Sequence, residues 1–269
     1  MQDTPMELAA PGLSRRRGDA WAWRLVATGL SFALFGLGGL LLRALVLPLL
    51  ACLPGDALAR RRRARAAISR AFRLHVWFMQ RSRVLDFRIE GAERLGRPGQ
   101  LVVANHPSLI DVVFLIGRIR DANCVVKQGL FRNPCTRGPV RAARYIGNDG
   151  SLDMLERAAA VLREGQCLVV FPEGTRTAPG RAPVFHRGAA AIALRGARVV
   201  TPVFVTVAPT TLTKAEPWYR IPDRRVQVTL RVGEDIDPAR FGDDAPPPIA
   251  SRRLNDHLHQ LFLRELATP

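Results

Sequence analysis

The chain has 269 residues, of which 48% are hydrophobic. This length suits one catalytic domain with a sizeable core and an appended segment, and the composition excludes a disordered protein. The net charge of +17 requires an anionic partner, either nucleic acid or the phosphate surface of a membrane. Residues 1–90 carry fifteen arginines and six acidic residues beside the most apolar part of the chain, so we expect anionic membrane lipids and no nucleic acid.

The cysteines and the motif inventory exclude several classes of protein. Four cysteines occur without a C-x-x-C pair or regular spacing, which indicates neither a zinc site nor a disulfide framework. The sequence has no G-x-S-x-G, P-loop or G-x-G-x-x-G motif, which argues against a serine hydrolase or a nucleotide-binding enzyme. No metal and no cofactor are expected.

The N-terminal region predicts a membrane anchor. Residues 1–20, with three consecutive arginines, are expected to form a mobile basic tail. Residues 25–42 form a run of eighteen uncharged residues between Arg24 and Arg43. The length of this run reaches the lower limit for a helix that spans a membrane. A cleaved signal peptide is the alternative, but no small-x-small cleavage site follows. Arginines flank both sides of the run, so the distribution of positive charge does not choose between a single span and a helical hairpin. Pro48 and Gly55 would permit the hairpin.

The next segment, residues 60–84, predicts a basic amphipathic helix. Apolar residues at helical spacing, including Ile68, Phe72 and Met79, lie largely opposite Arg65, Ser69 and several more arginines. Such a helix is typical of one lying in the headgroup plane; the alternative is a surface helix packed on the domain. We therefore expect residues 21–83 to form a membrane-anchoring and interfacial segment.

From residue 84 onward strands and helices alternate. This pattern predicts an α/β domain over residues 84–269, with a central mixed β-sheet flanked by helices. The expected strands are 84–91, 100–105, 122–130 running into a turn, 166–174, 198–207 and 226–236, and the expected helices are 108–119, 151–165, 188–196 and 249–267.

The stretch VVANHPSLIDVVFL, residues 102–115, carries the first candidate chemistry. His106 and Asp111 are five positions apart, so inside one helix they would lie about 140° apart around the axis. We expect Pro107 to begin the helix and His106 to fold back, so that Asp111 accepts from one ring nitrogen and the other faces a cleft. His106 would then take a proton from an acceptor alcohol that attacks an acyl thioester. A buried His–Asp pair is also a common structural feature.

A second candidate constellation ends the predicted strand LVVFPEGTRT, residues 168–177. Binding sites in α/β sheets form at the carboxyl ends of strands, where His106 also lies. Gly174 allows the backbone to approach a ligand, Thr175 offers a hydroxyl, and Arg176 offers a planar fork for a phosphate.

These blocks resemble a known family. NHPSLID fits the H-x4-D block and FPEGTRT the F-P-E-G-T-R block of the glycerolipid and lysophospholipid acyltransferases, and VVKQGL, VFHRGAAAIAL and VVTPVFV are similar to further blocks. The resemblance implies transfer of a fatty acyl group from acyl-carrier protein or acyl-CoA to the hydroxyl of a lysophospholipid of 1-acylglycerol-3-phosphate type. It also implies the inner (cytoplasmic) membrane, with the active site facing the cytoplasm. By this resemblance His106 is the base, Asp111 orients it, and the substrate-binding residues are Lys127, Glu173, Gly174, Thr175 and Arg176.

One departure concerns the acceptor. Asn148 and Asp149 stand where the family has an arginine for the acceptor phosphate, and losing such a fork costs about 1.5–3 kcal/mol. Either Arg141 or Arg144 reaches in, or the acceptor is not a simple phosphomonoester. The stretch YIGNDG resembles acyltransferases of specialised bacterial lipid pathways, including aryl-polyene ones. A non-enzymatic lipid-binding protein is a further alternative, although it would not need the His–Asp pair.

Overall fold

The computed structural model describes residues 20–242 and 245–267, so all but the last residue of the expected basic tail lies outside the described residues. Seven strands form one sheet in the order β1-β7-β6-β2-β5-β3-β4. All neighbours are parallel except β6 and β7, which confirms the predicted mixed sheet. The strands are β1 (Leu85–Glu90), β2 (Gln100–Ala104), β3 (Ala122–Lys127), β4 (Ile146–Asn148), β5 (Cys167–Val170), β6 (Val199–Ala208) and β7 (Val226–Val232).

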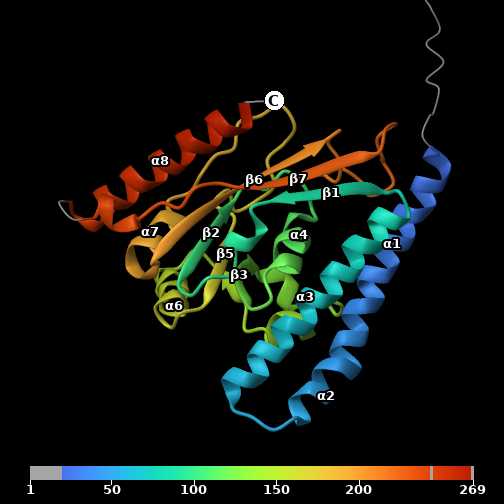
Figure 1. The fold of residues 1–269 in the computed structure, drawn as a ribbon, viewed down its shortest axis with the longest axis horizontal. Coiled ribbons are helices and arrows are strands. Elements are labelled where there is room, and N and C mark those ends of the chain that lie inside the picture. Colours follow the sequence, from blue (N-terminus) through green and yellow to red (C-terminus); the bar gives the residue numbers. More distant parts are fainter. Residues whose placement is uncertain (1–19, 243–244, 268–269) are drawn as a thin grey trace, which may run out of the picture.

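Helices cover both faces of the sheet (Figure 1). One face carries α4 (Asp111–Arg118) and α3 (Ala57–Arg81), with α1 (Trp21–Leu41) outside them; the other carries α6 (Leu152–Arg163), α7 (Gly188–Gly196) and α8 (Pro247–Ala267). Strand β2 shows why, since Leu101 and Val103 pack into one core and Val102 and Ala104 into the other. A strand apolar on both faces must be covered on both faces.

The N-terminal segment forms a helical hairpin. Helix α1 continues through a wider π-helical turn (Leu42–Val46) into α2 (Leu47–Cys52), and α3 returns beside it (Figure 1). The reversal follows Cys52 at Gly55, whose φ of +134° suits glycine. Residues 21–52 contain an 18-residue window with a mean hydropathy of 2.1, and the segment is long and apolar enough to cross a membrane. A row of large apolar side chains along α1 is exposed: Val26, Leu30, Leu34, Leu37 and Leu41.

Helix α3 differs from the expected interfacial helix. Its buried side chains include Ile68 and Met79, which belong to the core cluster shared with α4. Arg65 and Ser69, expected on the outer face, are each only 1% exposed. Ser69 donates to the Gly117 carbonyl, so the polar part of this face is turned toward the domain. The apolar face that contains Ile68 and Met79 therefore packs on the protein.

Two short elements in the chain were not expected. Helix α5 (Arg137–Ala142) and the three-residue strand β4 follow β3, and β4 pairs in parallel with β3 at the edge of the sheet. Three 3-10 turns, Ala92–Arg94, Gln128–Phe131 and Pro238–Phe241, complete the described elements. Strand β4 matters because it carries Asn148 to the same edge as the ends of its parallel neighbours.

Candidate active site

The candidate site lies where four neighbouring parallel strands end. His106 follows β2, the Phe171–Arg176 segment follows β5, and Lys127 and Asn148 are the last residues of β3 and β4. Because β2, β5, β3 and β4 are consecutive and parallel, their carboxyl ends meet at one edge. The structure thus brings together the residues of both predicted blocks and Lys127.

His106 and Asp111 form the expected pair. His106 Nδ1 lies 2.8 Å from Asp111 Oδ2, and Asp111 is fully buried. The carboxylate also accepts the Ser108 N–H at 2.7 Å and the Ser108 hydroxyl at 2.5 Å. With Nδ1 bound to a carboxylate, Nε2 is the ring nitrogen that can act on a ligand.

The turn that makes this geometry is longer than expected. Helix α4 begins at Asp111 and not at Pro107, because residues 106–110 form the bend that turns His106 back over the carboxylate. Asp111 lies in the first turn of α4, where a negative charge is favourable.

Glu173 accepts a hydrogen bond from the backbone of His106. It is 4% exposed, one carboxylate oxygen accepts the His106 N–H at 2.7 Å, and the other accepts a close hydrogen bond from the Thr177 hydroxyl. The Thr177 N–H in turn donates to the His106 carbonyl at 3.1 Å. Burial raises the pKa of Glu173 above its ordinary value, against the lowering effect of these hydrogen bonds. Both oxygens are used within the chain, and Glu173 does not line the cavity, so the geometry gives it a positioning role.

Arg176 contacts the long connection between β6 and β7. We call residues 209–225 the strap. Arg176 Nη1 donates to the carbonyls of Leu212 and Thr213 at 2.7 and 2.8 Å, and the Leu109 N–H donates to the same Leu212 carbonyl at 3.1 Å. The strap is therefore bonded directly to both site blocks.

The strap is also bonded to the N-terminal helix. Arg24 of α1 is 2% exposed, and its guanidinium donates to the carbonyls of Pro222, Asp223 and Arg224. The ring of Trp218 packs on α1, with its centroid 6.0 Å from that of Phe32. The strap thus joins α1 to the site.

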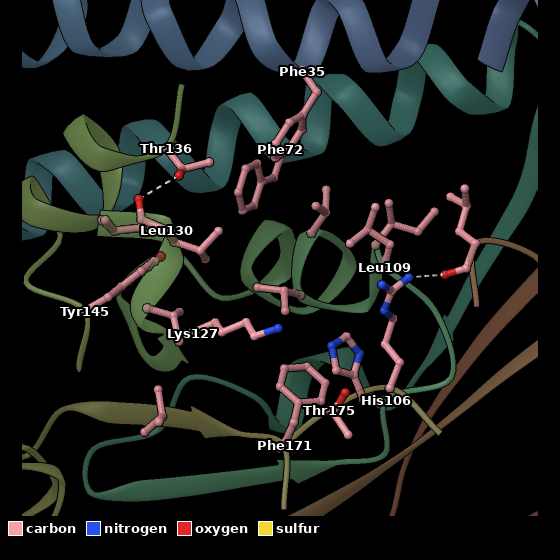
Figure 2. A pocket seen from close by; sticks show the side chains of 18 of the residues that line it. Phe35, Phe72, His106, Leu109, Lys127, Leu130, Thr136, Tyr145, Phe171 and Thr175 are labelled. Carbon is pink, nitrogen blue, oxygen red and sulfur yellow. Dashed lines mark hydrogen bonds between the residues drawn. The ribbon is translucent and has the colours of Figure 1, made fainter. Parts of the chain in front are cut away.

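A cavity of about 1130 Å³ is lined by His106. Figure 2 shows the Lys127 amine extending toward the His106 ring, Phe171 beside that ring, and Phe35 and Phe72 lining the far side under the N-terminal helices. The Phe171 and His106 ring centroids are 4.6 Å apart. Gly174, Thr175 and Arg176 also line this cavity. Its size exceeds that of most small-molecule pockets and suits a long apolar ligand.

Further polar residues line the cavity, some of them without a signal in the sequence pattern. Asn148 and Asp149 line the cavity, whereas Arg141 and Arg144 are exposed and do not. The Asp149 carboxylate accepts from Ser151, and these hydrogen bonds, with Arg157 nearby, lower its pKa. His186, Lys214 and Tyr145 line the cavity as well, and His75 adds a half-buried imidazole whose pKa burial lowers.

The fold and the site together suit one kind of chemistry. A histidine oriented by a buried carboxylate, placed at the strand ends of an α/β sheet and facing a long apolar cavity, is suited to proton transfer on a lipid-like substrate. Residues 86–206 match the family model described as Acyltransferase. This segment, a little under half of the chain, is similar to that family.

Individual relatives agree with the family match. The chain is 30% identical over 122 residues to the chloroplastic 1-acyl-sn-glycerol-3-phosphate acyltransferase of Arabidopsis thaliana, covering 43% of this chain and 34% of that protein. It is 24% identical over 149 residues to the 1-acyl-sn-glycerol-3-phosphate acyltransferase of Pseudomonas aeruginosa, covering 53% of this chain and 58% of that protein. It is 30% identical over 150 residues to the 1-acyl-sn-glycerol-3-phosphate acyltransferase of Saccharomyces cerevisiae, covering 52% of this chain and 48% of that protein. The matched segments thus span between a third and three-fifths of these relatives.

A solved structure shares the fold. The crystal structure of the 1-acyl-sn-glycerophosphate acyltransferase PlsC from Thermotoga maritima superposes with a TM-score of 0.70, covering 91% of this chain and 98% of that one, at 21% identity. The N-terminal helices therefore belong to the shared architecture, since residues 84–269 alone could not give this coverage.

Proposed function

We propose that the protein is a membrane-associated O-acyltransferase that moves a fatty acyl group from acyl-carrier protein or acyl-CoA to the hydroxyl of a lysophospholipid of 1-acylglycerol-3-phosphate type. The observation that carries the proposal is the 2.8 Å contact between Asp111 and Nδ1 of His106, which lines the apolar cavity. The relatives that match the chain are 1-acyl-sn-glycerol-3-phosphate acyltransferases by name.

In this mechanism His106 is the general base. Its Nε2 takes the proton of the acceptor hydroxyl while the hydroxyl oxygen attacks the thioester carbonyl, and Asp111 stabilises the imidazolium that forms. Collapse of the tetrahedral intermediate forms the ester and breaks the C–S bond. The imidazolium returns its proton to the leaving thiolate, so the histidine ends in its starting state. No side chain of the protein needs to be acylated.

The surroundings of His106 favour transfer over hydrolysis. An apolar cavity binds the acyl chain by burying it, at about 0.8 kcal/mol for each methylene, and leaves little room for water beside the thioester. Lys127, Thr175 and Arg176 supply the polar contacts to the substrates, with Gly174 allowing close approach. We assign Glu173 to positioning His106 instead of contacting the acceptor.

The exposed apolar row of α1 supports attachment to a membrane. Water-exposed leucines along a 32-residue helical segment would be costly in solution and are stable in lipid. Arginines beside this segment suit anionic headgroups. We propose the inner membrane, with the site on the cytoplasmic side where acyl-carrier protein and acyl-CoA occur.

The direct test uses detergent-solubilised enzyme and its His106→Ala variant with labelled acyl-carrier protein and labelled acyl-CoA. Each is offered lysophosphatidic acid, other lysophospholipids and a whole-cell lipid extract. His106-dependent labelling of lysophosphatidic acid is the expected result. Thioester hydrolysis as fast as transfer, or transfer that survives in the variant, would contradict the proposal.

A second candidate acceptor rests on the end of β4. Asn148 and Asp149 line the cavity, and Asp149 places a carboxylate near the acceptor. An acyltransferase of a specialised lipid pathway, such as an aryl-polyene-like one, would then acylate a hydroxyl on a lipid without a phosphomonoester. Labelling confined to a lipid in the whole-cell extract, with lysophosphatidic acid inert, is the result that supports this candidate.

A further inference from the structure

The two lysines of the protein line the same cavity. Among 40 basic residues the sequence has only Lys127 and Lys214, and all the others are arginines. His106 lines this cavity as well. Lys127 comes from the end of β3 and Lys214 from the strap, so the two side chains belong to elements far apart in the sequence.

Hydrogen bonds fix the part of the strap that carries Lys214. The carbonyls of the two preceding residues, Leu212 and Thr213, both accept from Arg176. Thr213 also donates its N–H and its hydroxyl to the Glu216 carboxylate, at 3.0 and 3.1 Å, which closes a turn around Lys214. The backbone of Lys214 is thus held next to the Arg176 guanidinium, while its side chain is exposed on the cavity wall.

Glu216 does not form an ion pair with Lys214. Its carboxylate bonds to Thr213, and within residues 20–242 and 245–267 no ion pair involves Lys214. A lysine beside an arginine on a cavity wall experiences repulsion unless an anion lies between them. The strap therefore presents an uncompensated positive charge to the ligand.

We propose that Lys214 is a phosphate-binding residue, which acts with Lys127 and Arg176 on the phosphate group of a substrate. Its role rests on the proposed function, because that function supplies the phosphorylated substrates. The acceptor phosphate is one source of this group, and the phosphopantetheine or nucleotide phosphates of the acyl donor are the other.

The end of β4 adds a carboxylate to the cavity lining and no arginine, which leaves room for a further cation. Arg157 lies 3.5 Å from the Asp149 carboxylate but does not line the cavity, and neither do Arg141 and Arg144. Arg176 Nη1 already donates to two strap carbonyls, so part of its fork is committed within the protein. A lysine has three donors on a flexible four-carbon stem and can bind a phosphate oxygen from an exposed loop.

The test compares full-length Lys214→Met with Arg220→Met, a matched variant on the same strap whose side chain is exposed and does not line the cavity. Calorimetry measures the Kd of a short-chain lysophosphatidic acid and of the monoacylglycerol without the phosphate. Kinetics measures KM for lysophosphatidic acid, acyl-CoA and acyl-carrier protein. Lys214→Arg is included because it keeps the charge.

If the acceptor supplies the phosphate, Lys214→Met weakens binding of lysophosphatidic acid about tenfold, equal to about 1.4 kcal/mol, without changing that of monoacylglycerol. Lys214→Arg should retain most of the affinity. If the donor supplies the phosphate, the KM for acyl-CoA or acyl-carrier protein rises instead. Unchanged Kd and unchanged KM values in Lys214→Met would overturn the proposal.

The same experiment separates this inference from the proposed function. Wild-type enzyme that binds lysophosphatidic acid through Lys214 but does not acylate it would leave the phosphate site standing and remove the proposed acceptor. If wild type acylates lysophosphatidic acid and Lys214→Met does so with the same kcat and KM values, the proposed function stands and the role of Lys214 is removed.

Discussion

His106 Nδ1 and Asp111 Oδ2 are 2.8 Å apart, and Asp111 is held in place by two further hydrogen bonds from Ser108. The carboxylate is fully buried, so these three donors compensate the cost of burying its charge. The arrangement fixes both the orientation and the tautomer of the imidazole. It follows that Asp111 contributes to catalysis through His106 and not by contact with the substrate.

Asp111→Asn is expected to lower kcat by about 10²–10⁴-fold, with little change in KM for either substrate. The amide favours the wrong tautomer and cannot stabilise the imidazolium as a carboxylate does. Ser108→Ala is the control, since it removes one donor to Asp111 and leaves the His106 contact; a loss below about tenfold is expected, on the scale of one hydrogen bond. Initial rates with near-native circular dichroism spectra measure both, and equal activity of Asp111→Asn and wild type would exclude the orienting role.

Arg176→Lys is expected to raise the KM for the acceptor more than that for the acyl donor. A lysine cannot bond to the Leu212 and Thr213 carbonyls and a phosphate with the geometry of a planar fork. The strap should also loosen, which limited proteolysis within residues 209–225 would detect. A larger change in donor KM would mean that the segment after β5 contacts the donor instead.

Arg24→Gln tests whether the N-terminal helix supports the site through the strap. The substitution removes the buried guanidinium that donates to three strap carbonyls, at about 0.5–1.5 kcal/mol for each hydrogen bond lost. We expect faster proteolysis of the strap and a higher acceptor KM, with unchanged binding to liposomes. Arg43→Gln is the control on the same helical segment, because Arg43 makes one long contact of 3.4 Å to Pro134. Equal effects of the two variants would show that the strap does not depend on α1.

Much of the α/β core followed from the sequence because its periodicity is strong. Strands such as β2 and β6 are runs of apolar residues, and α6 and α8 repeat their leucines at three or four positions. Strand β4 was missed because three residues cannot establish a period of two. The His106–Asp111 contact was predictable because both partners lie within one turn of the chain.

Contacts between distant segments could not be predicted. Arg65 was expected outside because arginines are rarely buried, yet it donates to the carbonyl of Ala143 and to the side chains of Asp121 and Gln166, which are 56 to 101 residues away. Burial lowers its pKa, and Asp121 offsets that effect. The strap has no apolar periodicity, and its partner Arg24 lies almost 200 residues earlier. Only the tertiary structure supplies such partners.

Glu173→Gln is expected to change the pH dependence of stability. Burial raises the pKa of Glu173 above its ordinary value of 4.5, so its ionisation opposes folding. Its contribution to stability is fully present below pH 4.5 and is lost as the pH rises through the folded-state pKa. The Tm of wild type relative to Glu173→Gln should therefore fall as pH rises across this window and level off above it. A difference that stays constant or rises with pH would show that the hydrogen bonds to His106 and Thr177 outweigh burial.

Gly39→Ala tests how closely α1 approaches the rest of the protein. A Cβ at Gly39 would lie 2.2 Å from the Cys135 carbonyl oxygen, whereas a Cβ at Gly38 would meet nothing within 4 Å. Alanine in a helix is normally more stable than glycine by about 0.5–1 kcal/mol, so Gly38→Ala should raise the Tm in detergent. Gly39→Ala must move α1 or the Cys135 backbone and should destabilise the protein by about 1–3 kcal/mol despite the same gain in helix propensity. If the two variants had equal Tm values, α1 would not be packed this closely on the segment before α5, and the cavity wall that they form together would have to be looser than described.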